Sequence, residues 1–147
     1  ANDNSNAQVV VSGTKRAVLN LSEKLKEIKK KGIILPVSAP FHCSLMKKAA
    51  EQMKNKIESI NFIKPLPKII SNVTAKEEDD INKIKPLLID QITSRVKWRD
   101  SINYMIDKGV DDFIEIGPGK VLSGLVKKIS KDVNIKNINT IEDIKND

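Results

Sequence analysis

The first part of the chain pairs a short apolar run with a segment in which apolar residues recur at helical spacing. The run over residues 8–12 predicts a strand, and Thr14 is a suitable N-cap for the helix that follows. The apolar face of this helix consists of Val18, Leu21, Leu25 and Ile28. Gly32 ends the helical pattern, and a second apolar run over residues 33–37 predicts another strand. These elements together predict a strand–helix–strand unit.

The rest of the chain continues this alternation. Two prolines bracket an irregular passage over residues 36–44. Helical periodicity predicts four further helices, over residues 46–60, 84–92, 98–105 and 122–129. Apolar runs predict strands over residues 68–73 and 113–116, and an acidic stretch predicts a loop over residues 77–80. Strands that alternate with helices are typical of an α/β protein, so we expect a largely parallel sheet.

Composition adds limits to this fold class. A length of 147 residues predicts a single domain, and 39% hydrophobic with 31% charged residues is typical of a globular protein. One cysteine cannot form an internal disulfide, and one cysteine with one histidine argues against a structural zinc site. Uncharged apolar runs are far shorter than the ~18 residues that a membrane span needs, and no secretory leader opens the chain. We therefore expect a soluble, cytoplasmic protein without a metal site.

The net charge of +7 raises the question of nucleic-acid binding. Three of the 26 cationic residues are arginines, and aromatic residues make up 3% of the chain. Nucleic-acid sites favour arginine for phosphates and base edges and aromatic side chains for single strands. The tightest lysine groups, over residues 29–31 and 127–131, fall at predicted helix ends, where cations complement the helix dipole. The pattern therefore argues against nucleic acid and leaves an acidic protein partner open.

His42 is the candidate for proton-transfer chemistry. It lies between a predicted strand and a predicted helix, where α/β proteins place functional side chains, and imidazole exchanges protons near neutral pH. A histidine that caps or packs is an equally good interpretation. Cys43 is more typical of a small buried thiol, and no strand–turn–helix elbow presents Ser44 as a nucleophile. The residues alone thus offer one general base and no nucleophile.

Gln91 places an amide near the end of the apolar face of the helix over residues 84–92. A structural amide held by hydrogen bonds is the favoured interpretation, since buried polar groups are usually paired. The functional alternative is a helix end that orients another group.

The sequence GPGK over residues 117–120 lies between a predicted strand and a predicted helix. It matches neither of the glycine-rich phosphate-binding patterns. It therefore predicts a tight turn that uses the positive φ of glycine.

Several motifs, taken in order, resemble those of one enzyme family. They are PVSAPFHCSLM over residues 36–46, NVTA over 72–75, QITS over 91–94 and EIGPGKVL over 115–122. With residues 2–10, they resemble the malonyl-CoA:acyl-carrier-protein transacylases of bacterial type II fatty-acid synthesis. The resemblance runs essentially end to end but covers the C-terminal half of the family's sequence. It implies that the other half carries a GHSxG serine elbow, an arginine for the malonyl carboxylate and a glutamine of the oxyanion region. An absent half would explain the missing nucleophile and the missing initiator methionine.

The resemblance also implies roles for particular residues. His42 would be the catalytic histidine, which takes the proton of the absent serine and later that of the carrier protein's phosphopantetheine thiol. The main-chain carbonyl of Gln91 would orient the imidazole in place of a carboxylate, so replacing the Gln91 side chain is expected to cost little. Phe41 would crowd α-branched acyl groups, while Asn2 and Asn4 match a loop near the cleft for substrate and carrier protein.

The family's fold implies that residues 1–37 form the second half of a small ferredoxin-like subdomain. Residues 38–147 would then be the C-terminal part of an α/β-hydrolase-like core. The implied substrates are malonyl-CoA and acyl carrier protein, with no bound cofactor, no nucleic acid or membrane partner, and a monomer at full length. The alternatives are an acyltransferase domain of a polyketide or multifunctional synthase, and a non-catalytic basic module that binds acidic protein or nucleic acid. The chain alone is expected to be inactive and unstable, because the sheet would lack its central strands.

Overall fold

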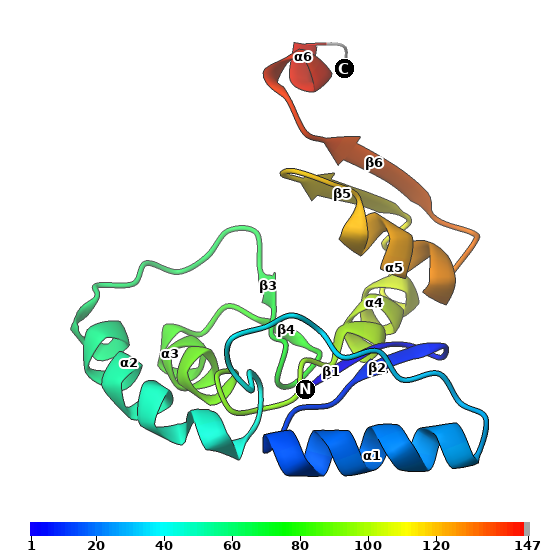
Figure 1. Ribbon diagram of the computed structural model, residues 1–147. Coiled ribbons are helices and arrows are strands. Elements are labelled where there is room, and N and C mark those ends of the chain that lie inside the picture. Colours follow the sequence, from blue (N-terminus) through cyan, green and yellow to red (C-terminus); the bar gives the residue numbers. More distant parts are fainter. Residues whose placement is uncertain (146–147) are drawn as a thin grey trace.

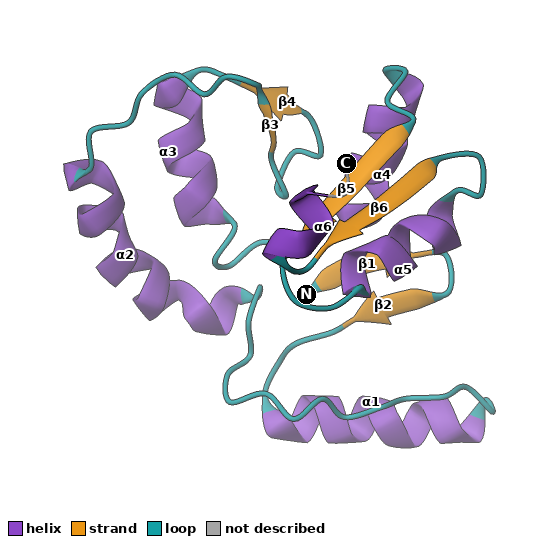
Figure 2. Ribbon diagram, turned by 90° about the horizontal axis from the view of Figure 1, so that it is seen from above, coloured by secondary structure: helices purple, strands orange, loops and turns teal. Residues whose placement is uncertain are grey.

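The computed structural model describes residues 1–145 as helices combined with three two-stranded sheets (Figures 1 and 2). The strands are β1 (Asn2–Ser5), β2 (Gln8–Val10), β3 (Ile69–Ile70), β4 (Glu77–Glu78), β5 (Asp112–Ile116) and β6 (Asn134–Ile138). The helices are α1 (Lys15–Glu27), α2 (Lys47–Ser59), α3 (Ile81–Asp90), α4 (Trp98–Asp107), α5 (Val121–Ile129) and α6 (Ile141–Lys145), with a single 3₁₀ turn, η1 (Ser44–Met46). The predicted mixture of helix and sheet is confirmed.

The expectation of a largely parallel sheet is wrong for the described residues. β5 and β6 pair in parallel, whereas β1–β2 and β3–β4 are antiparallel. The reason lies in the connections. A parallel pair needs a long crossover, which α5 supplies between β5 and β6, while strands joined by a short turn fold back as a hairpin.

The N-terminal hairpin leads into α1 much as the hydrophobic pattern predicts. β2 lies within the predicted range of residues 8–12. The Oγ1 atom of Thr14 accepts a hydrogen bond from the N–H of Ala17 at 3.3 Å, which confirms the predicted N-cap. The helix ends at Glu27, earlier than the stop predicted at Gly32.

The strand predicted over residues 33–37 is wrong, and the strand–helix–strand unit is wrong with it. After α1 the chain returns as a loop (Figure 1). In this loop Ile33 and Val37 are 69% and 60% exposed. An apolar run becomes a strand when a neighbouring strand accepts its backbone hydrogen bonds. Within residues 1–145 no strand pairs with this run.

The helices α2 and α3 pack against each other and confirm two predicted helices. Ala50 and Ile57 of α2 and Ile84 of α3 are buried. The ammonium of Lys85 on α3 donates to the carbonyl of Ile60, just beyond α2, at 2.8 Å. The last carbonyls of a helix lack partners inside it. The Lys85 side chain of α3 therefore caps the C-terminal end of α2.

The C-terminal part of the described chain is built around β5, α5 and β6. The predicted strand over residues 113–116 and the helix over 122–129 are confirmed, whereas the hydrophobic pattern does not predict β6 and α6. The main core lies where β1 packs against α4 and α5. Its buried apolar side chains are Val96, Ile102, Leu125 and Val126. Segments from the two ends of the described chain therefore share one core.

Large apolar side chains also lie exposed on the described surface. Leu66 is 95% exposed, Ile63 83%, Ile116 77% and Val121 72%. Ile63 and Leu66 lie in the loop after α2, and Ile116 and Val121 lie next to the turn before α5. None of the helices in residues 1–145 is long and apolar enough to cross a membrane.

Candidate active site

His42 lies in the loop that leads into η1, with its backbone in the left-handed region at a φ of 58°. That conformation costs a residue with a Cβ on the order of 1–2 kcal/mol, and such strain is typical of functional sites. Short bonds on both sides hold the loop. The N–H of Phe41 donates to the carbonyl of Ala39 at 3.0 Å, and the Sγ of Cys43 donates to the carbonyl of Pro40 at 3.1 Å.

The imidazole of His42 contacts the main chain at the end of α3. Its Nδ1 lies 2.8 Å from the carbonyl oxygen of Gln91. A carbonyl can accept but not donate, so Nδ1 carries the hydrogen and donates it. In the neutral ring Nε2 then has a free lone pair, which makes it the atom able to take a proton. The contact thus sets both the tautomer and the ring direction that a general base requires.

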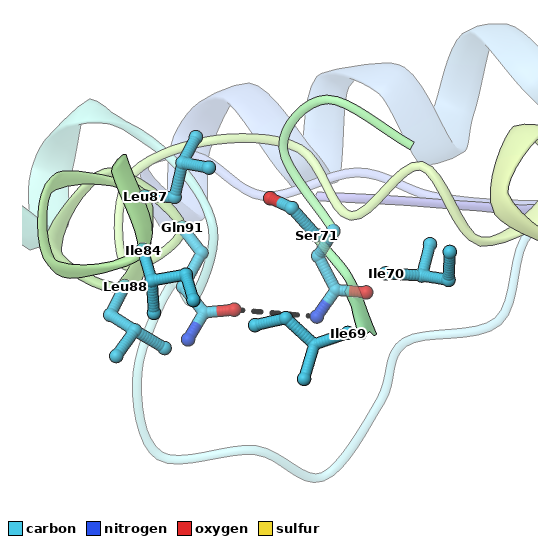
Figure 3. A pocket seen from close by; sticks show the side chains of 8 residues that line it. Ile69, Ile70, Ser71, Ile84, Leu87, Leu88 and Gln91 are labelled. Carbon is cyan, nitrogen blue, oxygen red and sulfur yellow. Dashed lines mark hydrogen bonds between the residues drawn. The ribbon is translucent and has the colours of Figure 1, made fainter. Parts of the chain in front are cut away.

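Gln91 is the C-cap of α3, which explains why its carbonyl is available. The last carbonyls of an α-helix have no partner within the helix. Its side chain is also paired: the Nδ2 of Asn72 donates to the Oε1 of Gln91 at 3.3 Å, the dashed bond in Figure 3. The side-chain amide of Gln91 is therefore paired, and its main-chain carbonyl lies within hydrogen-bond distance of His42.

Asn72 is a residue of this site whose contact the sequence does not predict. In the sequence it is the first residue of the NVTA motif over residues 72–75. The signal available was its place at the end of the predicted strand over residues 68–73, where loops of α/β proteins carry functional side chains. Nothing in the local pattern pointed from there to Gln91.

The other predicted site residues lie on two segments. Phe41 is 47% exposed beside His42. Asn2 and Asn4 are half-buried in β1. Asn2 forms a β-bridge with Val96, which follows Gln91 in the chain. β1 therefore lies beside the segment that begins at Gln91. Among the described residues, no cluster of three or more His, Cys, Asp or Glu side chains could hold a metal ion.

The turn before α5 is a structural feature, as its sequence predicts. Gly117 and Gly119 have φ values of 132° and 95°, which favour glycine. The carboxylate of Glu115 accepts the N–H groups of Leu122 and Ser123 at 3.0 and 2.8 Å. The hydroxyl and then the N–H of Ser123 are the main causes that lower the pKa of Glu115. A carboxylate thus occupies the helix N-terminus at which a phosphate would bind.

A buried carboxylate fixes β1 on α4. Asp3 is 5% exposed, and its Oδ2 lies 2.8 Å from Nη2 of Arg99. The other guanidinium nitrogen of Arg99 donates to Oδ1 of Asn6 at 2.7 Å. The N–H of Asp3 donates to the carbonyl of Val96 at 2.9 Å. These bonds join the N-terminal hairpin of β1 and β2 to the segment over residues 96–99, which follows Gln91.

Comparison with known proteins identifies relatives along nearly the whole chain, although no protein-family model matches it. A malonyl CoA-acyl carrier protein transacylase of Staphylococcus aureus (strain COL) is 44% identical over 146 residues, 99% of this chain and 47% of the relative. The crystal structure of an acyl-carrier-protein-S-malonyltransferase from Bartonella henselae matches with a TM-score of 0.94 and 41% identity, covering 99% of this chain and 47% of that one. A structure of a type II PKS acyl-carrier protein in complex with its malonyl-transacylase matches with a TM-score of 0.93 and 34% identity, again over 99% and 47%. The chain therefore spans about half the length of the relatives it matches, and the resemblance drawn from its motifs is confirmed.

Proposed function

We propose, from its homology with malonyl CoA-acyl carrier protein transacylases over 99% of its length, that this chain carries the catalytic histidine of such an enzyme. The reaction moves a malonyl group from coenzyme A to the phosphopantetheine thiol of acyl carrier protein. The observation that supports it is the bond of His42 Nδ1 to the Gln91 carbonyl, which leaves Nε2 as the basic atom. The nucleophilic serine would come from the part of the family's sequence that this chain does not span.

Each half-reaction uses the same nitrogen. Nε2 of His42 takes the proton of the serine hydroxyl as its oxygen attacks the thioester carbonyl of malonyl-CoA. The proton then passes to the departing coenzyme A sulfur, which leaves a malonyl-serine ester. In the second half, Nε2 takes the proton of the phosphopantetheine thiol, whose sulfur attacks the ester, and returns the proton to the serine oxygen. The Gln91 carbonyl accepts from Nδ1 throughout.

The remaining roles follow from the same resemblance. Phe41 would line the acyl site and crowd α-branched groups, and Asn2 and Asn4 would border the cleft for substrate and carrier protein. Coenzyme A and phosphopantetheine take part as substrates, so the proposal includes no bound cofactor. In this proposal the carrier protein is acidic, so the net charge of +7 of this chain would attract it. The enzyme would act in the cytoplasm as a monomer.

The finer description of the fold belongs to this proposal as well. Residues 1–37 would be the second half of a ferredoxin-like subdomain, and residues 38–147 the C-terminal part of a hydrolase-like core. The hairpin of β1 and β2 followed by α1 supports the first part. The parallel unit of β5, α5 and β6 supports the second.

The test is the substitution His42→Ala in the intact protein that contains this chain. Transfer of radiolabelled malonyl from coenzyme A to purified acyl carrier protein should fall by about 10³-fold or more, since both half-reactions lose their base. Asn82→Ala, at an exposed position on α3, is the matched control and should transfer normally. Near-normal turnover of the His42→Ala variant would reject the proposal. Efficient use of methylmalonyl-CoA by the wild-type protein would instead favour an acyltransferase domain of a polyketide synthase.

A further inference from the structure

We propose that Asn72 is a positioning residue for this reaction, because its side-chain amide anchors Gln91 and thereby fixes the carbonyl that orients His42. The inference rests on the proposed function. It also revises the expectation that the Gln91 side chain matters little.

The carbonyl of Gln91 belongs to a peptide plane beyond the regular α-helical hydrogen bonds. The N–H on the other side of that plane, from Ile92, donates to the carbonyl of Ile89, three residues back, at 3.2 Å, as in a tightened last turn. The N–H of Gln91 itself donates to the carbonyl of Leu87 at 3.0 Å and orients the preceding peptide. The direction in which the Gln91 carbonyl points therefore depends on what else holds this residue.

Asn72 supplies the second anchor through the Gln91 side chain. The 3.3 Å bond from its Nδ2 to Oε1 of Gln91 joins the turn after β3 to the end of α3 (Figure 3). Around it lies a small cavity of about 60 Å³ with mostly apolar walls, contributed by Ile69, Ile70, Ile84, Leu87 and Leu88. Few polar partners are available in such surroundings, so an amide that loses Asn72 must turn away to find one.

The turn that carries Asn72 is itself rigidly held. The carbonyl of Asn72 accepts the N–H of Lys97 at 3.0 Å. The preceding residue, Ser71, is 8% exposed, and its N–H donates to the carbonyl of Lys76 at 3.0 Å. Its hydroxyl accepts the N–H of Val73 at 3.2 Å. A continuous series of bonds therefore runs from this turn through Asn72 and Gln91 to Nδ1 of His42.

The test compares four variants of the intact transacylase in the malonyl-transfer assay. Asn72→Ala and Gln91→Ala each remove one side of the bond, so each should lower kcat by about tenfold, equivalent to about 1.4 kcal/mol. The KM for malonyl-CoA should change less than about twofold, because the binding contacts remain. The kcat of the double variant should equal that of the single variants, because each single substitution already removes the whole Asn72–Gln91 bond. Gln91→Glu retains an Oε acceptor and should keep most of the activity.

Two results would overturn the inference. One is a normal kcat in either single variant, Asn72→Ala or Gln91→Ala, and the other is an additive loss in the double variant. Using both Asn72→Ala and Gln91→Ala keeps the test decisive if one of them fails to fold.

A readout independent of catalysis separates this inference from the proposed function. The ¹⁵N resonances of His42 distinguish the Nδ1–H from the Nε2–H tautomer of the neutral ring. Wild type and the control Asn82→Ala should show Nδ1–H, whereas Asn72→Ala should show a mixture. An unchanged tautomer in Asn72→Ala rejects the positioning role, whatever the activity. Normal transfer by His42→Ala rejects the proposed function but leaves the tautomer result standing.

Discussion

Loss of the Arg99 guanidinium should destabilise the protein by more than an ordinary surface substitution. In Arg99→Ala the carboxylate of Asp3, 5% exposed, loses its partner at 2.8 Å. Breaking a fully buried pair from one side costs about 3–5 kcal/mol, because it leaves an uncompensated charge. The Arg99 side chain is 33% exposed, so water screens part of the interaction. Arg95, 4.0 Å from the same oxygen, offsets another part. We therefore expect the free energy of unfolding to fall by about 2–3 kcal/mol.

Urea unfolding of the intact protein measures this loss, with the fluorescence of Trp98 on the same helix as a local probe. The matched control is Lys54→Ala, which breaks an exposed pair with Glu58 at 3.8 Å and should cost less than about 0.5 kcal/mol. Adding Asp3→Asn to Arg99→Ala should restore much of the stability, because it removes the orphaned charge. Equal losses in Arg99→Ala and Lys54→Ala, or no recovery in the double variant, would refute the electrostatic explanation.

Two further predictions follow from the turn before α5 and from the exposed apolar surface. Because the folded state lowers the pKa of Glu115, its contribution to stability is present above the ordinary pKa of the unfolded chain and is lost as pH falls through the lower pKa of the folded state. The stability difference between wild type and Glu115→Gln should therefore shrink on acidification in urea titrations, and a difference independent of pH would contradict the capping role. Residues 1–147 purified alone should aggregate or unfold without a sharp transition, because side chains such as Leu66 and Ile116 are 95% and 77% exposed. A cooperative calorimetric transition would argue against this.

The helices could be predicted from the sequence because their causes are local. Backbone bonds in α1, α2, α3, α4 and α5 join residues a few positions apart, so the apolar spacing and caps such as Thr14 suffice to place them. The strands were harder because their partners are remote in sequence. The apolar run over residues 33–37 has the composition of a strand but no neighbour among residues 1–145. The polar sequence NIKNI of β6 does form one, since β5 lies beside it.

The candidate site likewise combines local features, which the sequence predicts, with contacts between residues remote in sequence, which it does not. The sequence by itself identified His42 as the residue able to exchange protons, because imidazole chemistry and a loop between elements are local properties. The contact between His42 and Gln91 joins residues 49 positions apart, and that between Asn72 and Gln91 joins residues 19 apart. Periodicity cannot encode such pairs, because they depend on how α3, the turn after β3 and the His42 loop pack together. The sequence thus determined which group can accept a proton, and the tertiary structure decided which of its nitrogens is free to do so.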